Sequence, residues 1–254
     1  MTDRIEPNGV GTMSTTTDPC CLSYWFPLIE SAGLPVPRTK FFTTDCELWK
    51  MFHSQTPDRF DDFIAQLRNA ATEVSPSGPW FLRTGLTSAK HSWKETCFVT
   101  DLDKLKSHVF RIAEFSECAD IMGLPYHTWV VREMLSTKPA FTAFYGSMPI
   151  VREFRFFIRD GSIEHIQPYW PEESIEVPSE PDWKDRFASL SKITPEEFET
   201  IKSLVLRASA AVPGFWSIDL LDTERGWFVT DMAPGERSYR YEPETPVGPT
   251  GGTR

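Results

Sequence analysis

Two apolar stretches near the C-terminus, separated by a short polar segment, are the feature that most constrains how this chain can fold. The stretches cover 216–221 and 227–232, and the segment between them reads Asp-Thr-Glu-Arg-Gly. This pattern predicts a β-hairpin. With a five-residue loop, Asp219 faces Val229, and Asp231 lies two residues further along the partner strand on the same face. The two carboxylates are then diagonal neighbours, about 7 Å apart between their Cα atoms.

Paired carboxylates of this kind point toward a divalent cation. A buried carboxylate needs a partner or a metal, and both aspartates have apolar neighbours along their strands. Mg²⁺ prefers hard oxygen ligands and binds phosphates through one or two carboxylates. We therefore interpret Asp219 and Asp231 as ligands for one or two Mg²⁺ ions, and the alternative is that each is a solvated residue at a strand end.

Helical and extended segments alternate along the remainder of the chain. Apolar spacing predicts helices over 22–32, 57–74, 101–122 and 195–211, with Asp58 capping the second, Phe115 on the inner side of the third and Thr194 capping the last. Extended segments are predicted over 38–42, 80–83, 95–100, 127–135, 140–159 and 163–169. This order favours an α+β fold with antiparallel sheets rather than a parallel doubly wound sheet.

Composition and charge narrow the class of protein. The chain has 254 residues, of which 40% are hydrophobic, so it can bury a substantial core. Its formal net charge of −10 argues against nucleic acid as a partner. No apolar run approaches the roughly 18 residues of a membrane span, and the five cysteines show no zinc spacing, so we expect a cytoplasmic protein with reduced thiols. Residues 1–19 and 243–254 have the composition of disordered tails.

Basic residues gather around one predicted loop and on one predicted strand. Arg83, Lys90 and Lys94 bracket a segment rich in Gly, Ser and Thr, where they suit binding of nucleotide phosphates. Arg155 lies on the polar face of the strand 151–161, and its planar guanidinium suits a phosphate fork. The alternative is that all four are solvated surface cations.

A third candidate region is the extended segment 127–136. Its end is a possible hinge between lobes, at which Glu133, Met134 and Leu135 would meet an adenine ring, with apolar side chains packing on the base. A plain buried strand is the alternative.

Together these motifs resemble the ATP-grasp superfamily over about residues 22–242. The segments that carry the resemblance are AGLPVPRTKF, FLRTGLTSAKHSWK, VVREMLS, REFRFFIRDGSIEHIQ and SIDLLDTERGWFVTDMAPGE, in this order. The pattern is especially similar to the cell-division-cycle branch that chaperones assembly of a translation initiation factor, and to small phage and bacterial ATP-grasp proteins. The resemblance implies two α+β lobes holding ATP, with an N-terminal lobe at 20–78, a small lobe at 79–135 and a catalytic lobe at 136–242.

The resemblance also implies roles for individual residues. Arg83 takes the place of the first phosphate-binding lysine, Lys90 or Lys94 acts from the loop, and Arg155 contacts the transferred phosphate. Glu133, Met134 and Leu135 form the adenine hinge, and Asp219 and Asp231 ligate Mg²⁺. The family often ends this hairpin with an Asn where this chain has Ala233, so Glu236 or Ser238 is expected to supply the missing oxygen.

The function implied is that of an ATP- and Mg²⁺-dependent carboxylate–amine ligase that acts through an acylphosphate, with Lys90 and Arg155 as catalytic residues. Its carboxylate and amine substrates are unknown, and a peptide or protein end is one candidate. The main alternative is a non-catalytic, ATP-binding assembly chaperone. A nucleic-acid ligase is a distant alternative because Ile158 stands where a nucleophilic lysine is needed, and the signature motifs of a protein kinase are absent from the sequence.

Overall fold

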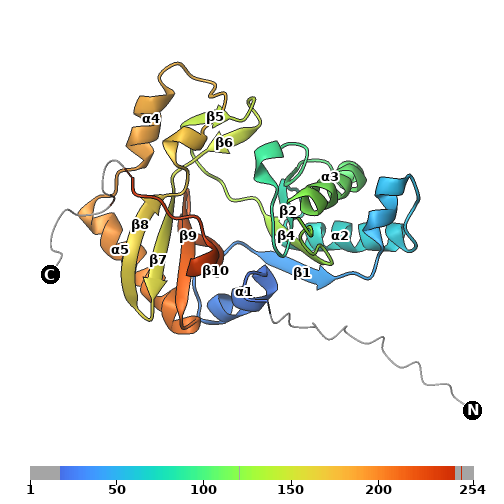
Figure 1. Cartoon of the computed structure of the whole chain (residues 1–254), viewed down its shortest axis with the longest axis horizontal. Coiled ribbons are helices and arrows are strands. Elements are labelled where there is room, and N and C mark those ends of the chain that lie inside the picture. Colours follow the sequence, from blue (N-terminus) through green and yellow to red (C-terminus); the bar gives the residue numbers. More distant parts are fainter. Residues whose placement is uncertain (1–17, 120, 244–246, 248–254) are drawn as a thin grey trace, which may run out of the picture.

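The computed structural model describes residues 18–119, 121–243 and 247. The expected tails at 1–19 and 243–254 lie almost wholly outside these residues. The described part of the chain combines helices with antiparallel sheets, which confirms the predicted α+β class. It forms two halves side by side, with a small third unit above them (Figure 1).

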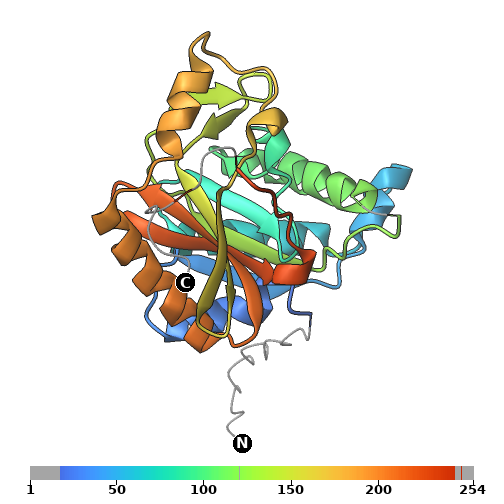
Figure 2. The ribbon, with the colours of Figure 1, turned by 60° about the vertical axis from the view of Figure 1, so that its left-hand side comes forward.

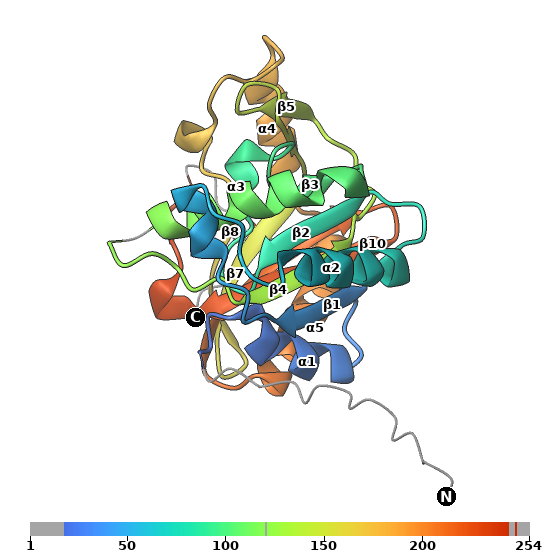
Figure 3. The ribbon, with the colours of Figure 1, turned by 90° about the vertical axis from the view of Figure 1, so that its right-hand side faces the viewer.

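The first half is built on a four-stranded sheet with strand order β1-β4-β2-β3. Helices α2 and α3 cover its outer face (Figure 3), and Phe63, Leu67, Val109 and Trp129 pack between the layers. The strands are β1 (Thr39–Thr43), β2 (Trp80–Thr84), β3 (Phe98–Val99) and β4 (Thr128–Glu133), and the helices are α2 (Phe60–Val74) and α3 (Leu105–Cys118), with η1 (Leu48–His53), η2 (Lys90–Ser92) and η3 (Leu102–Lys104) in the connections.

The second half is a four-stranded sheet with strand order β10-β9-β7-β8. Its apolar face, which carries Phe154, Phe156 and Ile218, packs against two helices, and the longer of these lies along the sheet (Figure 2). The opposite face carries Glu153, Arg155 and the hairpin aspartates. The strands are β7 (Glu153–Arg159), β8 (Ser162–Pro168), β9 (Phe215–Thr223) and β10 (Gly226–Pro234), and the helices are α1 (Leu22–Ser31) and α5 (Pro195–Ala211), with η5 (Gly235–Arg237) after β10.

The small third unit joins a hairpin to a helix through a cluster of aromatic side chains. It comprises β5 (Phe141–Ala143), β6 (Met148–Ile150), η4 (Glu172–Ser174) and α4 (Trp183–Leu190). Its core includes Phe144, Trp170 and Phe187, and it also takes in Trp93 from the loop that follows β2. The unit therefore contacts the first half at the segment that carries Lys90.

The segment 20–78, expected as an N-terminal lobe, contributes to both halves. Helix α1 packs with α5 and the second sheet through Trp25 and Phe26. Strand β1 pairs with β4, and α2 lies on the same sheet. The lobe boundaries remain a prediction.

Helix α5 begins where the sequence predicts, because its first turn satisfies its own backbone donors. Thr194 accepts from the amide of Glu197 at 3.2 Å, and the Glu197 carboxylate accepts from the amide of Thr194 at 2.9 Å. Pro195 follows at the first helical position, where its missing N–H costs nothing. Such a capping box stabilises a helix by about 1 kcal/mol.

Three local predictions were wrong. Asp58 does not cap α2, since Arg59 occupies the N-cap with φ of 60° and Asp58 instead pairs with Lys50 at 3.1 Å. Phe115 is 41% exposed rather than inside. Helix α4 was not predicted, because its eight residues contribute a single buried side chain, Phe187, and give little periodic signal.

The register of the C-terminal hairpin also differs from the prediction. Val229 pairs with Leu220, and a bulge between Val229 and Asp231 sets Asp231 directly opposite Asp219. The predicted five-residue loop is shorter in the structure, where Gly226 pairs with Thr223. A bulge adds one residue to one strand, and this extra residue turns the expected diagonal pair into a direct one.

Among the described residues, none of the helices combines the length and the apolar character that crossing a membrane requires.

Candidate functional site

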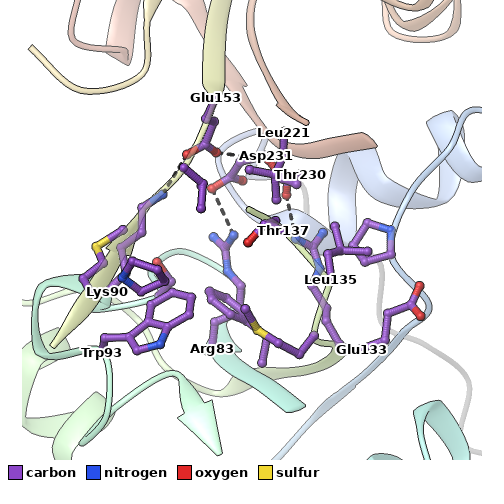
Figure 4. A pocket seen from close by; sticks show the side chains of 18 residues that line it. Arg83, Lys90, Trp93, Glu133, Leu135, Thr137, Glu153, Leu221, Thr230 and Asp231 are labelled. Atoms are coloured by element: carbon purple, nitrogen blue, oxygen red, sulfur yellow. Dashed lines mark hydrogen bonds and ion pairs between the residues drawn. The ribbon is translucent and has the colours of Figure 1, made fainter. Parts of the chain in front are cut away.

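The two sheets face each other across a cleft of about 740 Å³, open solvent at its mouth included. One end is apolar and the other is charged (Figure 4). The apolar lining comprises Pro37, Phe81, Trp93, Met134, Leu135, Met148, Pro149, Val151 and Leu221, and the charged lining comprises Arg83, Lys90, Arg132, Glu153 and Asp231. A cleft of this size that combines apolar walls with a few converging polar groups is typical of a small-molecule site.

Arg83 reaches the cleft from β2 and ties the two halves together. Its Nη1 donates to Oδ2 of Asp231 at 3.0 Å, and its Nε donates to the carbonyl of Thr84 at 3.0 Å. The side chain is 6% exposed, so this ion pair is shielded from water on the arginine's side. The sequence prediction that Arg83 is a cation of the site agrees with this position.

Lys90 reaches the same place from η2. Its Nζ lies 3.8 Å from Oε2 of Glu153 and 3.8 Å from the centre of the Tyr169 ring (Figure 4 shows the pair with Glu153). Burial lowers the pKa of Lys90, but Glu153 and Tyr169 raise it by more, so the net shift is upward. The amine therefore stays charged throughout the physiological range.

Arg132, on β4, is a residue of this cleft that the sequence reasoning did not assign. It is 4% exposed, and its Nη1 donates to the carbonyl of Thr230 at 2.6 Å. Its Nε and Nη2 have no hydrogen-bond partner within the described part of the chain. Burial and the nearby Arg83 lower the pKa of Arg132, yet a guanidinium keeps its proton at neutral pH. A charged, buried group with free donors is a binding point for an anion.

The two hairpin aspartates have different partners. Asp219 accepts from Nε and Nη2 of Arg155 at 2.8 and 2.9 Å, which is the bidentate geometry of a strong ion pair. Asp231 accepts from Arg83 and, through Oδ1, from the amide of Met232 at 3.1 Å. Burial raises the pKa of Asp231, but Arg83 and Arg132 lower it by more, so the carboxylate stays ionised.

Glu153 adds a third carboxylate to this end of the cleft. Its Oε1 accepts from the hydroxyl of Thr230 at 3.3 Å, and burial together with Asp219 raises its pKa against the lowering effect of Lys90. The sequence placed Glu153 on the polar face of its strand beside Arg155, and its neighbours on that face were the signal that could have identified it.

The donor set suits a cation that is shared with a ligand. Within residues 18–119 and 121–243, no group of three or more His, Cys, Asp or Glu is arranged to hold a metal ion. Asp219 and Asp231 nevertheless stand opposite each other on paired strands. Two carboxylates are enough for Mg²⁺ when phosphate oxygens and water complete its shell.

Not every predicted residue reaches this place. Glu236 is 64% exposed and lies 4.0 Å from Arg159, at the far end of β7 from Arg155. Lys94 is exposed, and its backbone amide donates to the Ser147 hydroxyl at 3.4 Å. Ser238 bonds to Ser217. These three predictions are not supported by proximity to the carboxylate pair.

The expected hinge residues divide into two kinds. Met134 and Leu135 line the apolar end of the cleft. The carboxylate of Glu133 turns away from it (Figure 4) and accepts from Nε of Arg38 at 3.1 Å and from Arg225 at 2.9 Å. Glu133 therefore ties the linker before β1 to the tip of the second sheet's hairpin.

The comparisons with known proteins agree on the fold. A family model described as an ATP-grasp domain, family 3 of its clade, matches residues 57–248. No match to the sequence was found among curated proteins. Among solved structures, C-terminally truncated Cdc123 from Schizosaccharomyces pombe aligns with a TM-score of 0.52 at 15% identity, covering 85% of this chain and 83% of that one.

Two ligase structures are also similar. D-alanine–D-alanine ligase from Bacillus anthracis, complexed with ATP, has a TM-score of 0.46 at 12% identity and covers 85% of this chain and 54% of its own. The ATP-grasp ligase PsnB, complexed with the precursor peptide PsnA2 and AMPPNP, has a TM-score of 0.41 at 14% identity and covers 82% and 46%. The chain thus spans about half the length of these ligases.

Proposed function

The chain belongs to the ATP-grasp domain family whose model it matches, and from this premise we propose that its cleft binds ATP with Mg²⁺ and that the protein is a carboxylate–amine ligase. The single observation that carries the proposal is the joint presence of an apolar end and three buried or half-buried cations, Arg83, Lys90 and Arg132, in one cleft. This division matches a nucleotide, which has an apolar base and an anionic tail.

The base would lie at the apolar end, between Phe81, Met134 and Leu135. The triphosphate would then reach Arg83 and Lys90, and the unpaired donors of Arg132 make it a third contact. Asp219 and Asp231 would hold Mg²⁺, which when bound neutralises phosphate charge and orients the terminal phosphoryl group.

The proposed reaction has two steps. An oxygen of the substrate carboxylate attacks the γ-phosphorus, the bond to the β–γ bridging oxygen breaks, and ADP leaves. An amine nitrogen then attacks the acyl carbon, phosphate leaves, and the amine loses a proton as the amide forms. Arg155 would stabilise the transferred phosphoryl group from β7, while Lys90 would act from the loop. The acid and amine substrates are not specified, and the end of a peptide or protein is the class we retain.

A second candidate, a non-catalytic ATP-binding assembly factor, is favoured by one feature of the site. Ala233 offers no side-chain oxygen, and both oxygens of Asp219 are already engaged by Arg155. With fewer free ligands, nucleotide binding without turnover is a reasonable outcome. Substrate-stimulated release of ADP or phosphate separates the two candidates.

Titration calorimetry with ATP and with GTP, each with and without Mg²⁺, tests the proposal. We expect ATP to bind, with affinity at least about tenfold higher when Mg²⁺ is present, since the cation offsets repulsion between phosphate and the aspartates. Asp231→Asn should remove most of this Mg²⁺ enhancement, whereas Asp185→Asn, on the exposed side of α4, should leave it intact. Circular dichroism checks that each variant is folded.

Absence of ATP binding by the folded wild-type protein would refute the nucleotide assignment. An unchanged Mg²⁺ effect in Asp231→Asn would refute the metal assignment alone.

A further inference from the structure

The loop that carries Lys90 rests on aromatic side chains from the far side of the cleft. Lys90 Nζ lies 3.8 Å from the centre of the Tyr169 ring and 5.6 Å from that of Trp170. His91 stacks on Phe144, with 4.8 Å between ring centres and an interplanar angle of 6°. We call Phe144, Tyr169 and Trp170 the aromatic clamp.

The ring of Tyr169 also contacts a second cation. The guanidinium carbon of Arg155 lies 4.9 Å from the centre of the same ring. Tyr169 therefore lies in cation–π contact with Lys90, which belongs to the loop after β2, and with Arg155, which belongs to β7. Its amide donates to the carbonyl of Glu153 at 2.9 Å, and this bond fixes the residue to the strand that carries Arg155.

The clamp has its own supports. Tyr169 and Trp170 pack edge to face at 5.1 Å, and Trp170 lies 5.3 Å from Phe144. Phe144 and the next residue, Tyr145, both adopt left-handed backbone conformations, with φ of 53° and 60°. Side chains at such positions are held there against a conformational cost, which the surrounding contacts must offset. The turn places the Phe144 ring beneath His91.

From this geometry we propose that Tyr169 is a positioning residue, which holds the Lys90 loop against the second sheet so that the Lys90 ammonium and the Arg155 guanidinium act on the same phosphate chain. The inference rests on the proposed nucleotide-binding function only for its consequence on affinity. The clamp itself is a contact within the protein.

Hydrogen–deuterium exchange in the full-length protein without nucleotide tests the clamp directly. The loop amides of Ser92, Glu95 and Thr96 donate to backbone carbonyls within the loop, so they report its opening. Tyr169→Leu removes the ring face and should raise their exchange about tenfold, the effect expected for loss of one partly desolvated cation–π contact. Amides in α2 should be unaffected.

Two control variants isolate the ring. Tyr169→Phe retains the ring face, and loop exchange should stay within about twofold of wild type. Tyr239→Leu removes a tyrosine that stacks on Tyr241 at 6.0 Å and is 61% exposed, and it should leave the loop unchanged.

A further variant keeps the inference testable if Tyr169→Leu does not fold. Lys90→Gln retains most of the side-chain stem but removes the charge, and it should raise exchange of the same loop amides. Adding Tyr169→Leu to Lys90→Gln should then give little further change, because both substitutions remove one contact.

Binding measurements complete the test. Tyr169→Leu should weaken Mg²⁺–ATP binding about tenfold, as loss of the same contact implies, and leave adenosine binding unchanged, since adenosine has no phosphate for Lys90 to contact. Unchanged loop exchange in folded Tyr169→Leu, or in Lys90→Gln, would overturn the inference. Faster loop exchange in a protein that binds no ATP would leave the clamp standing and overturn the proposed function instead.

Discussion

Replacing Asp219 by Asn is expected to destabilise the folded protein strongly, because it strands a buried arginine. Asp219 and Arg155 form two hydrogen bonds of 2.8 and 2.9 Å, and their side chains are 4% and 16% exposed. Removing one partner of a buried ion pair costs about 3–5 kcal/mol. Arg155 keeps some solvent contact and the Tyr169 ring, so we expect the lower end, about 3 kcal/mol.

A surface pair of the same chemistry provides the comparison. Lys40 and Glu73 lie 2.9 Å apart, with side chains 55% and 60% exposed. Glu73→Gln should change the free energy of unfolding by about 0.5 kcal/mol or less, because exposed ion pairs contribute little. The two pairs have similar separations, so burial is the main difference between them.

Urea unfolding followed by fluorescence of the nine tryptophans measures both changes. With a denaturant dependence of about 3 kcal/mol per molar, Asp219→Asn should lower the urea midpoint by about 1 M. The double variant Asp219→Leu with Arg155→Met removes both charges and should recover most of this loss. A loss for Asp219→Asn no larger than that for Glu73→Gln, or a double variant less stable than Asp219→Asn, would refute the reasoning.

Two further predictions concern stability elsewhere. The hydrogen bond from Arg152 holds the pKa of Glu197 at about 2, against burial, so the stabilisation is present above the ordinary value of 4.5 and lost as pH falls toward 2. Glu197→Gln should therefore cost about 1–2 kcal/mol at pH 7 after allowance for solvent screening, and almost nothing at pH 2, as measured by urea unfolding at both pH values. Gly235→Ala should cost about 1–3 kcal/mol, because an added Cβ would lie 2.5 Å from the Phe215 ring, and a melting temperature equal to that of wild type would contradict this.

The parts of the fold that the sequence predicted well are those set by neighbouring residues. Helix α5 needs only Thr194, Pro195 and Glu197 to define its start, and these lie within one turn. The C-terminal hairpin follows from apolar runs either side of a polar segment. Family membership came from the order of such local motifs rather than from any single one.

Long-range contacts and added residues could not be predicted in the same way. Strand alternation does not reveal the bulge between Val229 and Asp231, because an extra residue changes the register without changing the apolar pattern. Arg83 and Asp231 are 148 residues apart, so no local rule pairs them. Arg132 looked like an interior strand residue, and only the fold shows that two of its donors lack partners among the described residues.

The ion pairs across the cleft bear on how ATP and Mg²⁺ would bind if the proposed function holds. Arg83 neutralises Asp231, so a triphosphate that takes Arg83 for itself leaves that carboxylate facing a like charge. A divalent cation at Asp231 removes this repulsion, and the nucleotide in turn supplies the remaining oxygen ligands. Each ligand thus makes good what the other disrupts, and by thermodynamic linkage each should raise the affinity of the other by the same factor. The same exchange keeps every buried charge paired, since Arg83 passes from a carboxylate to a phosphate while Asp231 passes from a guanidinium to a metal.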